Sequence, residues 1–266
     1  MLNETILFAF GLTLLAGLAT GLGSLMAFFT KKFSPKFLAI SLGFSAGVMV
    51  YVSLVEIFAK ARVSLSLSLG DSLGYIITIA AFFVGIILMG IIDRLIPSVE
   101  NPHEIKNIEE KNVKNEKKLL RVGIFSALAI AIHNFPEGLA TFMGALSDPA
   151  IGISIAAAIA IHNIPEGIAV SVPVYYSTKS KAKAFWISFL SGLAEPVGAL
   201  LGFFIFGQLF NGITFGIVFA AVAGIMVYIS LDELLPAAEE YGEHHIAIGG
   251  FIVGMFVMAI SLFLFA

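Results

Sequence analysis

Long apolar segments recur from one end of the 266-residue chain to the other, and they constrain its fold more than any other feature. A helix needs about 20 apolar residues to cross a bilayer. The sequence predicts eight transmembrane helices, over residues 4–30, 36–59, 72–96, 121–146, 149–174, 182–209, 212–238 and 245–265. Only 12% of the residues are charged, about half the share of a soluble domain. We therefore expect an all-α integral membrane protein that forms one transmembrane domain over residues 1–266.

Lysine and arginine are distributed unevenly between the segments that connect the expected helices. If the N-terminus lies outside, 13 of the 15 basic residues fall on the inner side, and only Lys60 and Arg62 fall outside. Loops rich in Lys and Arg stay in the cytoplasm, so we expect both termini outside in a multi-pass protein of the cell membrane. The long polar segment 97–120 has mixed charge, which predicts a flexible cytoplasmic linker within the domain.

Two of the expected helices share a sequence although they would run in opposite directions. Residues 45–56 and 222–233 are identical at eight of twelve aligned positions, including a methionine, a tyrosine, a serine and a glutamate. Residues 15–20 align with 190–195, and the third and eighth helices match weakly. We interpret helices one to three and six to eight as an inverted repeat, with helices four and five between the halves. Inverted repeats around a midplane site are typical of secondary transporters.

Helices four and five each carry a His-Asn-X-Pro-Glu-Gly motif near the midpoint, at residues 133–138 and 162–167. Ionisable residues at this depth are costly in lipid and normally face an internal cavity. Two imidazoles, three carboxylates and two amide oxygens suit a divalent transition metal such as Zn, Fe or Co, and the carboxylates extend the range toward Mn. The candidate metal ligands are His133, Asn134, Glu137, His162, Asn163, Glu166 and Glu195.

Other interpretations of these polar residues stay open at this point. The same side chains could join the helices by hydrogen bonds without binding a metal. A metal held by His and Glu could activate water in an intramembrane metalloprotease, although the HExxH pattern is missing. A metal-regulated sensor would bind the ion without moving it. Two facing motifs and the inverted repeat favour a transporter over all three, so we expect no enzymatic activity.

The strings HNFPEG and HNIPEG resemble the paired signatures of the ZIP (Zrt/Irt-like) metal transporters. The longer strings GFSAGVMVYVSLVEI, SGLAEPVGA and AGIMVYISLDELLP are similar to the bacterial zinc transporters of that family. The resemblance implies a 3+2+3 helix arrangement, import of zinc (or Fe, Mn, Co or Cd) and a binuclear site with Glu166 as a bridge. It also suggests a homodimer and an elevator-like motion. The metal would be the substrate rather than a cofactor, and nucleic acid would not be a partner.

Acidic residues also lie near the ends of the repeated helices. Glu56 lies toward the outer end of the second helix, and its repeat mate Glu233 toward the inner end of the seventh. The inverted repeat therefore places one glutamate near each mouth of the expected ion pathway, and we call these mouths the outer and the inner vestibule. We expect Glu56, together with Met49, to bind the ion on its way in, and Asp232 and Glu233 to bind it on its way out. The alternative is that these are ordinary carboxylates at helix ends.

Overall fold

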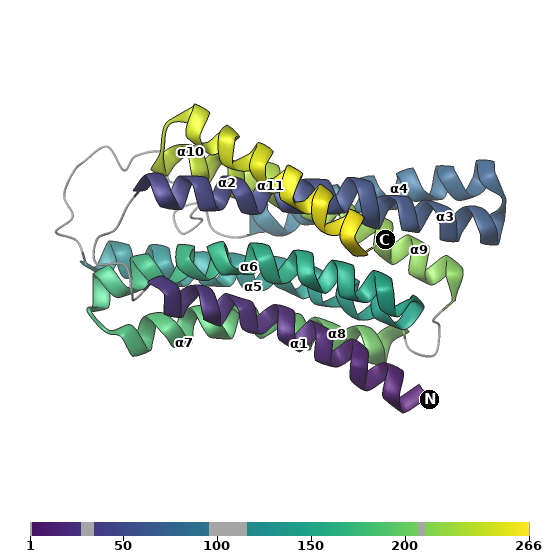
Figure 1. Cartoon of the computed structure of the whole chain (residues 1–266), viewed down its shortest axis with the longest axis horizontal. Helices are drawn as coiled ribbons and strands as arrows, with labels where there is room; N and C mark the ends of the chain where they lie inside the picture. The colour runs from purple at the N-terminus through teal and green to yellow at the C-terminus, as the bar shows by residue number, and fades with distance from the viewer. Residues whose placement is uncertain (1, 28–34, 96–115, 207–210, 266) are drawn as a thin grey trace.

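The computed structural model describes residues 2–27, 35–95, 116–206 and 211–265, and the regular structure in these ranges is helical (Figure 1). The helices are α1 (Leu2–Ala27), α2 (Pro35–Tyr51), α3 (Phe58–Leu69), α4 (Asp71–Leu95), α5 (Glu116–Ser147), α6 (Pro149–Thr178), α7 (Lys181–Gly192), α8 (Ala194–Phe206), α9 (Gly212–Ile229), α10 (Leu235–Tyr241) and α11 (His244–Phe265). Short π-helical turns over Val52–Ile57 and Ser230–Leu234 join α2 to α3 and α9 to α10.

Seven helical stretches of the described chain are long and apolar enough to cross a membrane. They are α1, α2 with α3, α4, α6, α7 with α8, α9 with α10, and α11. The expectation of an all-α integral membrane protein is therefore confirmed. The remaining long helix, α5, is not among these seven stretches, and it packs against α6.

The second helical stretch is longer than the sequence predicted. We expected it to end at residue 59, but it continues through the π-helical turn and α3 to Leu69, where Gly70 with a φ of 86° ends it. Lys60 and Arg62, expected in a loop, therefore lie on a helix. Ala61 and Leu65 are buried, because α3 packs against α4 and α9. This tertiary packing keeps residues 60–69 helical, although we expected them in a loop.

Two further boundaries differ from the prediction. The sixth expected helix is broken at Leu193, which separates α7 from α8. The fourth begins at Glu116 instead of residue 121, so the last five residues of the expected linker are helical. The rest of that linker, residues 97–115, lies outside the described residues.

Polar side chains fix the start of α6 and α9. Asp148 accepts a hydrogen bond from the backbone nitrogen of Ala150 at 2.8 Å, and Pro149 occupies the first turn, where no amide hydrogen is needed. Asn211 accepts bonds from the backbone nitrogens of Ile213 and Thr214 at 2.9 and 3.0 Å. Both residues satisfy donors that have no partner within the helix, which defines where each helix begins.

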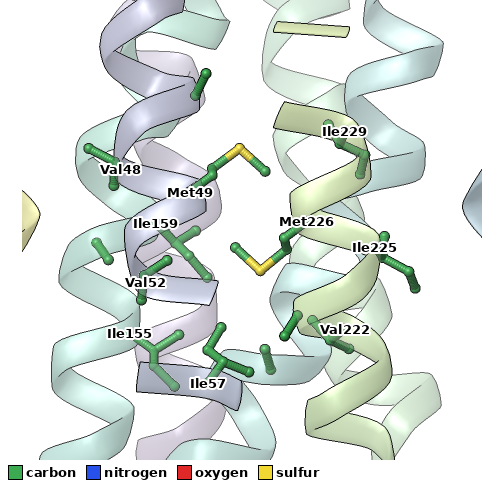
Figure 2. Close-up of a cluster of buried hydrophobic side chains, with 14 of the residues drawn as sticks. Val48, Met49, Val52, Ile57, Ile155, Ile159, Val222, Ile225, Met226 and Ile229 are labelled. Atoms are coloured by element: carbon green, nitrogen blue, oxygen red, sulfur yellow. The ribbon is translucent and has the colours of Figure 1, made fainter. Parts of the chain in front are cut away.

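The helices form two layers (Figure 1). α1, α5, α6, α7 and α8 pack together in one layer, and α2, α3, α4, α9, α10 and α11 form the other. The principal apolar cluster lies where α2, α6 and α9 meet (Figure 2). Met49 on α2 and Met226 on α9 extend toward each other there, beside Ile155 and Ile159 of α6. The surfaces by which the two layers meet are thus largely apolar in this region.

The repeated segments approach their neighbours at equivalent positions. A Cβ added to Gly47 on α2 would lie 2.0 Å from the backbone oxygen of Phe251 on α11. A Cβ at the aligned Gly224 on α9 would lie 2.0 Å from the backbone oxygen of Phe82 on α4. The two stretches also run in opposite directions, because α2 leads to α3 from left to right in Figure 1, whereas α9 leads to α10 from right to left.

Candidate metal centre

The two His-Asn-X-Pro-Glu-Gly motifs lie on α5 and α6, which pack side by side. Both helices continue through the proline of the motif without a break. Glu195 lies in the first turn of α8, directly after the break at Leu193. A Cβ at Gly138 would meet the backbone of Glu195 at 2.0 to 2.5 Å, so α8 reaches α5 at the motif itself. α5, α6 and α8 therefore meet in one buried region, at the two motifs and Glu195.

The described ligand candidates are fully buried. Their exposed fraction is 0% in each case, and they are Asn134, Glu137, His162, Asn163, Glu166 and Glu195. The side chain of His133, the seventh candidate, falls outside the described part of the structure, although its backbone lies in α5. Buried carboxylates need a partner or a cation, because an isolated charge is very costly in a low dielectric.

His162 and Glu137 form a direct pair between α6 and α5. The Nε2 atom of His162 lies 3.2 Å from both carboxylate oxygens of Glu137. One ring hydrogen can point at only one of these oxygens, and Oε1 is the oxygen left without a hydrogen bond. One residue of each motif therefore contacts the other motif between α5 and α6.

The two asparagines connect the motifs to the repeat halves. Asn163 donates from Nδ2 to the backbone oxygen of Ala16 at 3.0 Å and also to Oε1 of Glu195. Asn134 donates from Nδ2 to the backbone oxygen of Ser191 at 3.3 Å. Ala16 and Ser191 are aligned residues of the two halves. The side-chain amide of each asparagine is thus oriented by a backbone carbonyl at the equivalent position of one repeat half. The Oδ1 atom of each asparagine stays available to another partner.

Glu166 has a partner that the sequence did not single out. Ser45 on α2 donates from Oγ to Oε1 of Glu166 at 3.2 Å, and both side chains are fully buried. Ser45 belongs to the repeated segment, but its repeat mate is the apolar Val222, so the repeat gave no reason to select it. The only feature of the sequence that could have pointed to Ser45 is that it is a polar residue in an otherwise apolar helix. This bond joins the ligand cluster to the second layer of helices.

Buried oxygens of the ligand candidates that receive no hydrogen bond within the described chain include Asn134 Oδ1, Glu137 Oε1 and Asn163 Oδ1. A buried acceptor without a partner costs on the order of 1–3 kcal/mol, so such groups are rare unless a cation or water satisfies them. Among the described side chains, His162 and Glu137 form a pair, and no three His, Asp or Glu residues form one group that could hold a metal ion. The donor set fits a divalent cation chemically, because it offers neutral amide oxygens beside carboxylates.

The three acidic residues predicted to line the ion pathway lie on the two π-helical turns, whereas Met49 lies on α2. Glu56 belongs to the first turn, where its side chain is 20% exposed and its Oε1 lies 3.8 Å from Nζ of Lys60. Glu233 belongs to the second turn and is buried, whereas its neighbour Asp232 is exposed. π-Helical turns are rare and occur frequently at functional sites. The two predicted vestibule carboxylates are therefore placed on equivalent irregular turns.

Serine hydroxyls support both turns in the same way. Ser53 donates to the backbone oxygen of Met49 at 2.6 Å, and the aligned Ser230 donates to that of Met226 at 2.7 Å. Such bonds to a carbonyl four residues earlier often accompany bends in a helix. Met49 itself is fully buried in the apolar cluster between the layers. Its role beside the incoming ion stays a prediction.

Comparison with known proteins gives the family. The sequence pattern of the family described as ZIP Zinc transporter matches residues 96–262. The chain belongs to this family. It is 67% identical over 267 residues to the Zinc transporter ZupT of Chlorobaculum parvum, a match that covers 99% of this chain and 100% of that ZIP protein.

Two further ZIP proteins are almost as similar. The Zinc transporter ZupT of Chlorobium chlorochromatii is 64% identical over 267 residues, and that of Streptococcus mutans is 61% identical over 264 residues. Each match covers 99% of this chain and 100% of the relative. The resemblance drawn from the motifs is thereby confirmed. The ZIP relatives are named as transporters, which also confirms that the chain is not an enzyme.

Proposed function

We propose that this chain is a secondary transporter that imports zinc, and related divalent ions such as Fe, Mn, Co and Cd, across the cell membrane into the cytoplasm. The observation that carries the proposal is the set of fully buried imidazole, amide and carboxylate groups where α5, α6 and α8 meet. The names of the similar ZIP proteins support zinc as the substrate. No ATP site is expected, because the sequence lacks the Gly-Lys pairing of a Walker A loop.

The topology we propose has eight membrane-spanning helices in a 3+2+3 inverted repeat, with both termini outside. α5 serves as the eighth span, because its 32 residues pack along α6 and α8. The equivalent glycine contacts and the opposite directions of α2–α3 and α9–α10 support the repeat. The N-terminal end of α1 and the C-terminal end of α11 both lie in the right half of Figure 1, which supports termini on one side.

The ion is proposed to bind in a binuclear site made of the seven predicted ligands, with Glu166 between two metal ions. The oxygens of Asn134, Glu137 and Asn163 that lack a hydrogen-bond donor would accept the cation directly. The hydrogen bond between His162 and Glu137 would give way to metal coordination, which requires an unprotonated imidazole nitrogen and an ionised carboxylate. Proton and metal therefore compete for the same atoms.

Alternating access is proposed to move one layer of helices against the other. α5 and α6 contact α1, α7 and α8 extensively, so these helices would move as one body and carry the ligands with them. The apolar side chains where α6 meets α2 and α9 offer a surface without directional bonds along which the layers can slide (Figure 2). The hydroxyl of Ser45, which reaches Glu166 across the layers, would have to release its bond during this movement.

A homodimer is proposed on the exposed faces of two helices in the second layer. α4 and α11 are the least buried of the candidate membrane helices, and their exposed apolar residues include Ile76, Phe83, Ile252 and Phe256. Lipid covers such faces in a monomer, and a second copy would cover part of them in a dimer. Cross-linking of the chain in its native membrane distinguishes the two arrangements.

Zinc flux into proteoliposomes tests the proposed function. The purified full chain is reconstituted around a zinc-sensitive fluorescent dye, and zinc is added outside without ATP. We expect a saturable rise in fluorescence that protein-free liposomes lack, driven by the zinc gradient and increased by an inside-negative potential. Zinc binding to the protein without any flux would instead support a sensor and contradict the transporter.

Replacement of the vestibule carboxylates gives a smaller expected effect. Glu56→Gln and Glu233→Gln should each slow zinc uptake by roughly threefold to tenfold, or on the order of 1 kcal/mol, because each carboxylate would assist passage of the ion without being a ligand of the central site. The readout is the initial rate in the same proteoliposomes, and Glu4→Gln at an exposed position is the matched control. Wild-type flux in a variant with both substitutions would remove the vestibule roles of these two residues.

A further inference from the structure

A cavity of about 240 Å³ lies at the end of the bundle where α5 turns into α6, and no residue of the two motifs lines it. Its wall is made by the π-helical turn and α3 on one side, by the start of α6 on another and by Leu262 of α11. The polar residues that line it are Glu56, Lys60, Asp148 and Ser154. The proposed topology places this end of the bundle outside.

The charged groups of the cavity are partly withdrawn from water. The side chain of Glu56 is 20% exposed and that of Lys60 is 42% exposed, with 3.8 Å between Oε1 and Nζ. Asp148 adds a second carboxylate, which also caps α6 by accepting from the nitrogen of Ala150. Two carboxylates and one ammonium leave the cavity with a net charge of about −1, which attracts cations.

Ser154 is an independent sign that the cavity takes a ligand. Its side chain is only 5% exposed, it lines the cavity, and its hydroxyl makes no hydrogen bond within the described chain. The hydroxyl of such a nearly buried residue normally has a partner, and here the partner has to come from the cavity that the residue lines. A hydrated or partly dehydrated cation held by Glu56 and Asp148 would offer that partner, either directly or through a bound water.

We propose that this cavity is a capture site for the incoming divalent cation and that the ammonium group of Lys60 is its built-in counter-ion, which the metal displaces. The inference rests on the proposed transport function and names a further site of the same pathway. A divalent ion neutralises both carboxylates, whereas Lys60 neutralises one, so exchange of ammonium for metal is electrostatically favourable. The ammonium group of Lys60 also disfavours binding of monovalent cations, because a monovalent cation carries no more charge than the ammonium group it would replace.

The repeat shows that the lysine is not demanded by the fold. If the alignment of residues 45–56 with 222–233 is carried four residues further, Ala237 stands opposite Lys60. The π-helical turn near Glu233 forms without a lysine at that position. Replacement of Lys60 should therefore leave the turn intact and change only the charge in the cavity.

Zinc uptake by lysine variants of the full chain tests this assignment. Lys60→Gln should lower the zinc concentration for half-maximal uptake by about threefold to fivefold, as expected for loss of a partly exposed competing ion pair. Lys60→Arg should stay near wild type. The matched control is Arg62→Gln, which makes the same change in charge two residues away, where the guanidinium lies 4.3 Å from the ring centre of Tyr75 rather than against a cavity carboxylate.

A double-mutant cycle separates a specific pair from a general change in surface charge. In a Glu56→Gln background, Lys60→Gln should change the half-saturating zinc concentration much less than it does in wild type, because the direct partner of Lys60 is gone. Asp148→Asn should raise that concentration while α6 stays capped, because Asn caps helices as well as Asp. An equal shift in Arg62→Gln, no shift in Lys60→Gln, or a shift of undiminished size beside Glu56→Gln would each overturn the proposal.

Direct binding distinguishes failure of this site from failure of the transport proposal. Binding of zinc chloride to the detergent-purified chain, followed with radioactive zinc, should be tighter for Lys60→Gln than for wild type whether or not the protein transports. Zinc flux by wild type with identical binding and uptake by Lys60→Gln would overturn the capture site alone. Tighter binding by Lys60→Gln without any wild-type flux would support the capture site and contradict the proposed function.

Discussion

Glu137→Gln and Glu166→Gln are each expected to lower the initial rate of zinc uptake by roughly 100-fold or more. Changes to groups that merely orient metal ligands typically cost 10–100-fold in metal affinity, and these two carboxylates are proposed to be ligands themselves. Glutamine keeps the size of the side chain but removes the negative charge that balances the cation. The measurement is uptake into proteoliposomes at a zinc concentration well below saturation.

The matched control for both variants is Glu4→Gln, which makes the same chemical change at an exposed position of α1. Each variant should be extracted and eluted like wild type, because glutamine can still accept from His162 or Ser45. Alanine substitution of His133 and His162 should cause losses of similar size. Transport at the wild-type rate by all four variants would show that the ligand assignment is wrong.

Gly23→Ala is expected to lower the free energy of unfolding by about 1–3 kcal/mol, the usual cost of forcing an extra methyl group into a packed interior. The added Cβ would lie 2.0 Å from the backbone oxygen of Ile164, which belongs to the second motif on α6. α1 would have to move away from the helix that carries His162 and Glu166. Zinc uptake should fall together with stability.

The control for this substitution lies on the same helix. Gly11 has nothing within 4 Å of an added Cβ, so Gly11→Ala should leave stability unchanged or raise it slightly, since alanine favours a helix over glycine. Unfolding in mixed detergent, followed by circular dichroism, measures both variants. Equal stability of Gly23→Ala and Gly11→Ala would mean that the close approach of α1 to α6 does not limit the fold.

Much of the fold could be predicted because its signals are local. Apolar runs located the membrane helices, and the repeat of residues 45–56 at 222–233 predicted two equivalent helical segments. The position at which α3 ends could not be predicted from such local signals. Lys60 and Arg62 look like loop residues, but they lie on a helix because Ala61 and Leu65 pack against neighbours that are distant in sequence.

The same distinction holds for the candidate site. Six of the predicted ligands are buried where expected, because a motif fixes which residues share a helix face. Their partners depend on which helix lies opposite. The contact of Ser45 with Glu166 and the meeting of Glu56 with Asp148 in one cavity join segments far apart in the chain, and neither has a sequence signal of its own.

The most direct test of the central claim is the position of zinc in a crystal of the protein, located by anomalous scattering at the zinc absorption edge. The account predicts a strong peak within coordination distance of Glu137, His162 and Glu166, between α5 and α6. Zinc found only at the ends of the bundle, with no anomalous signal among these buried side chains, would contradict it.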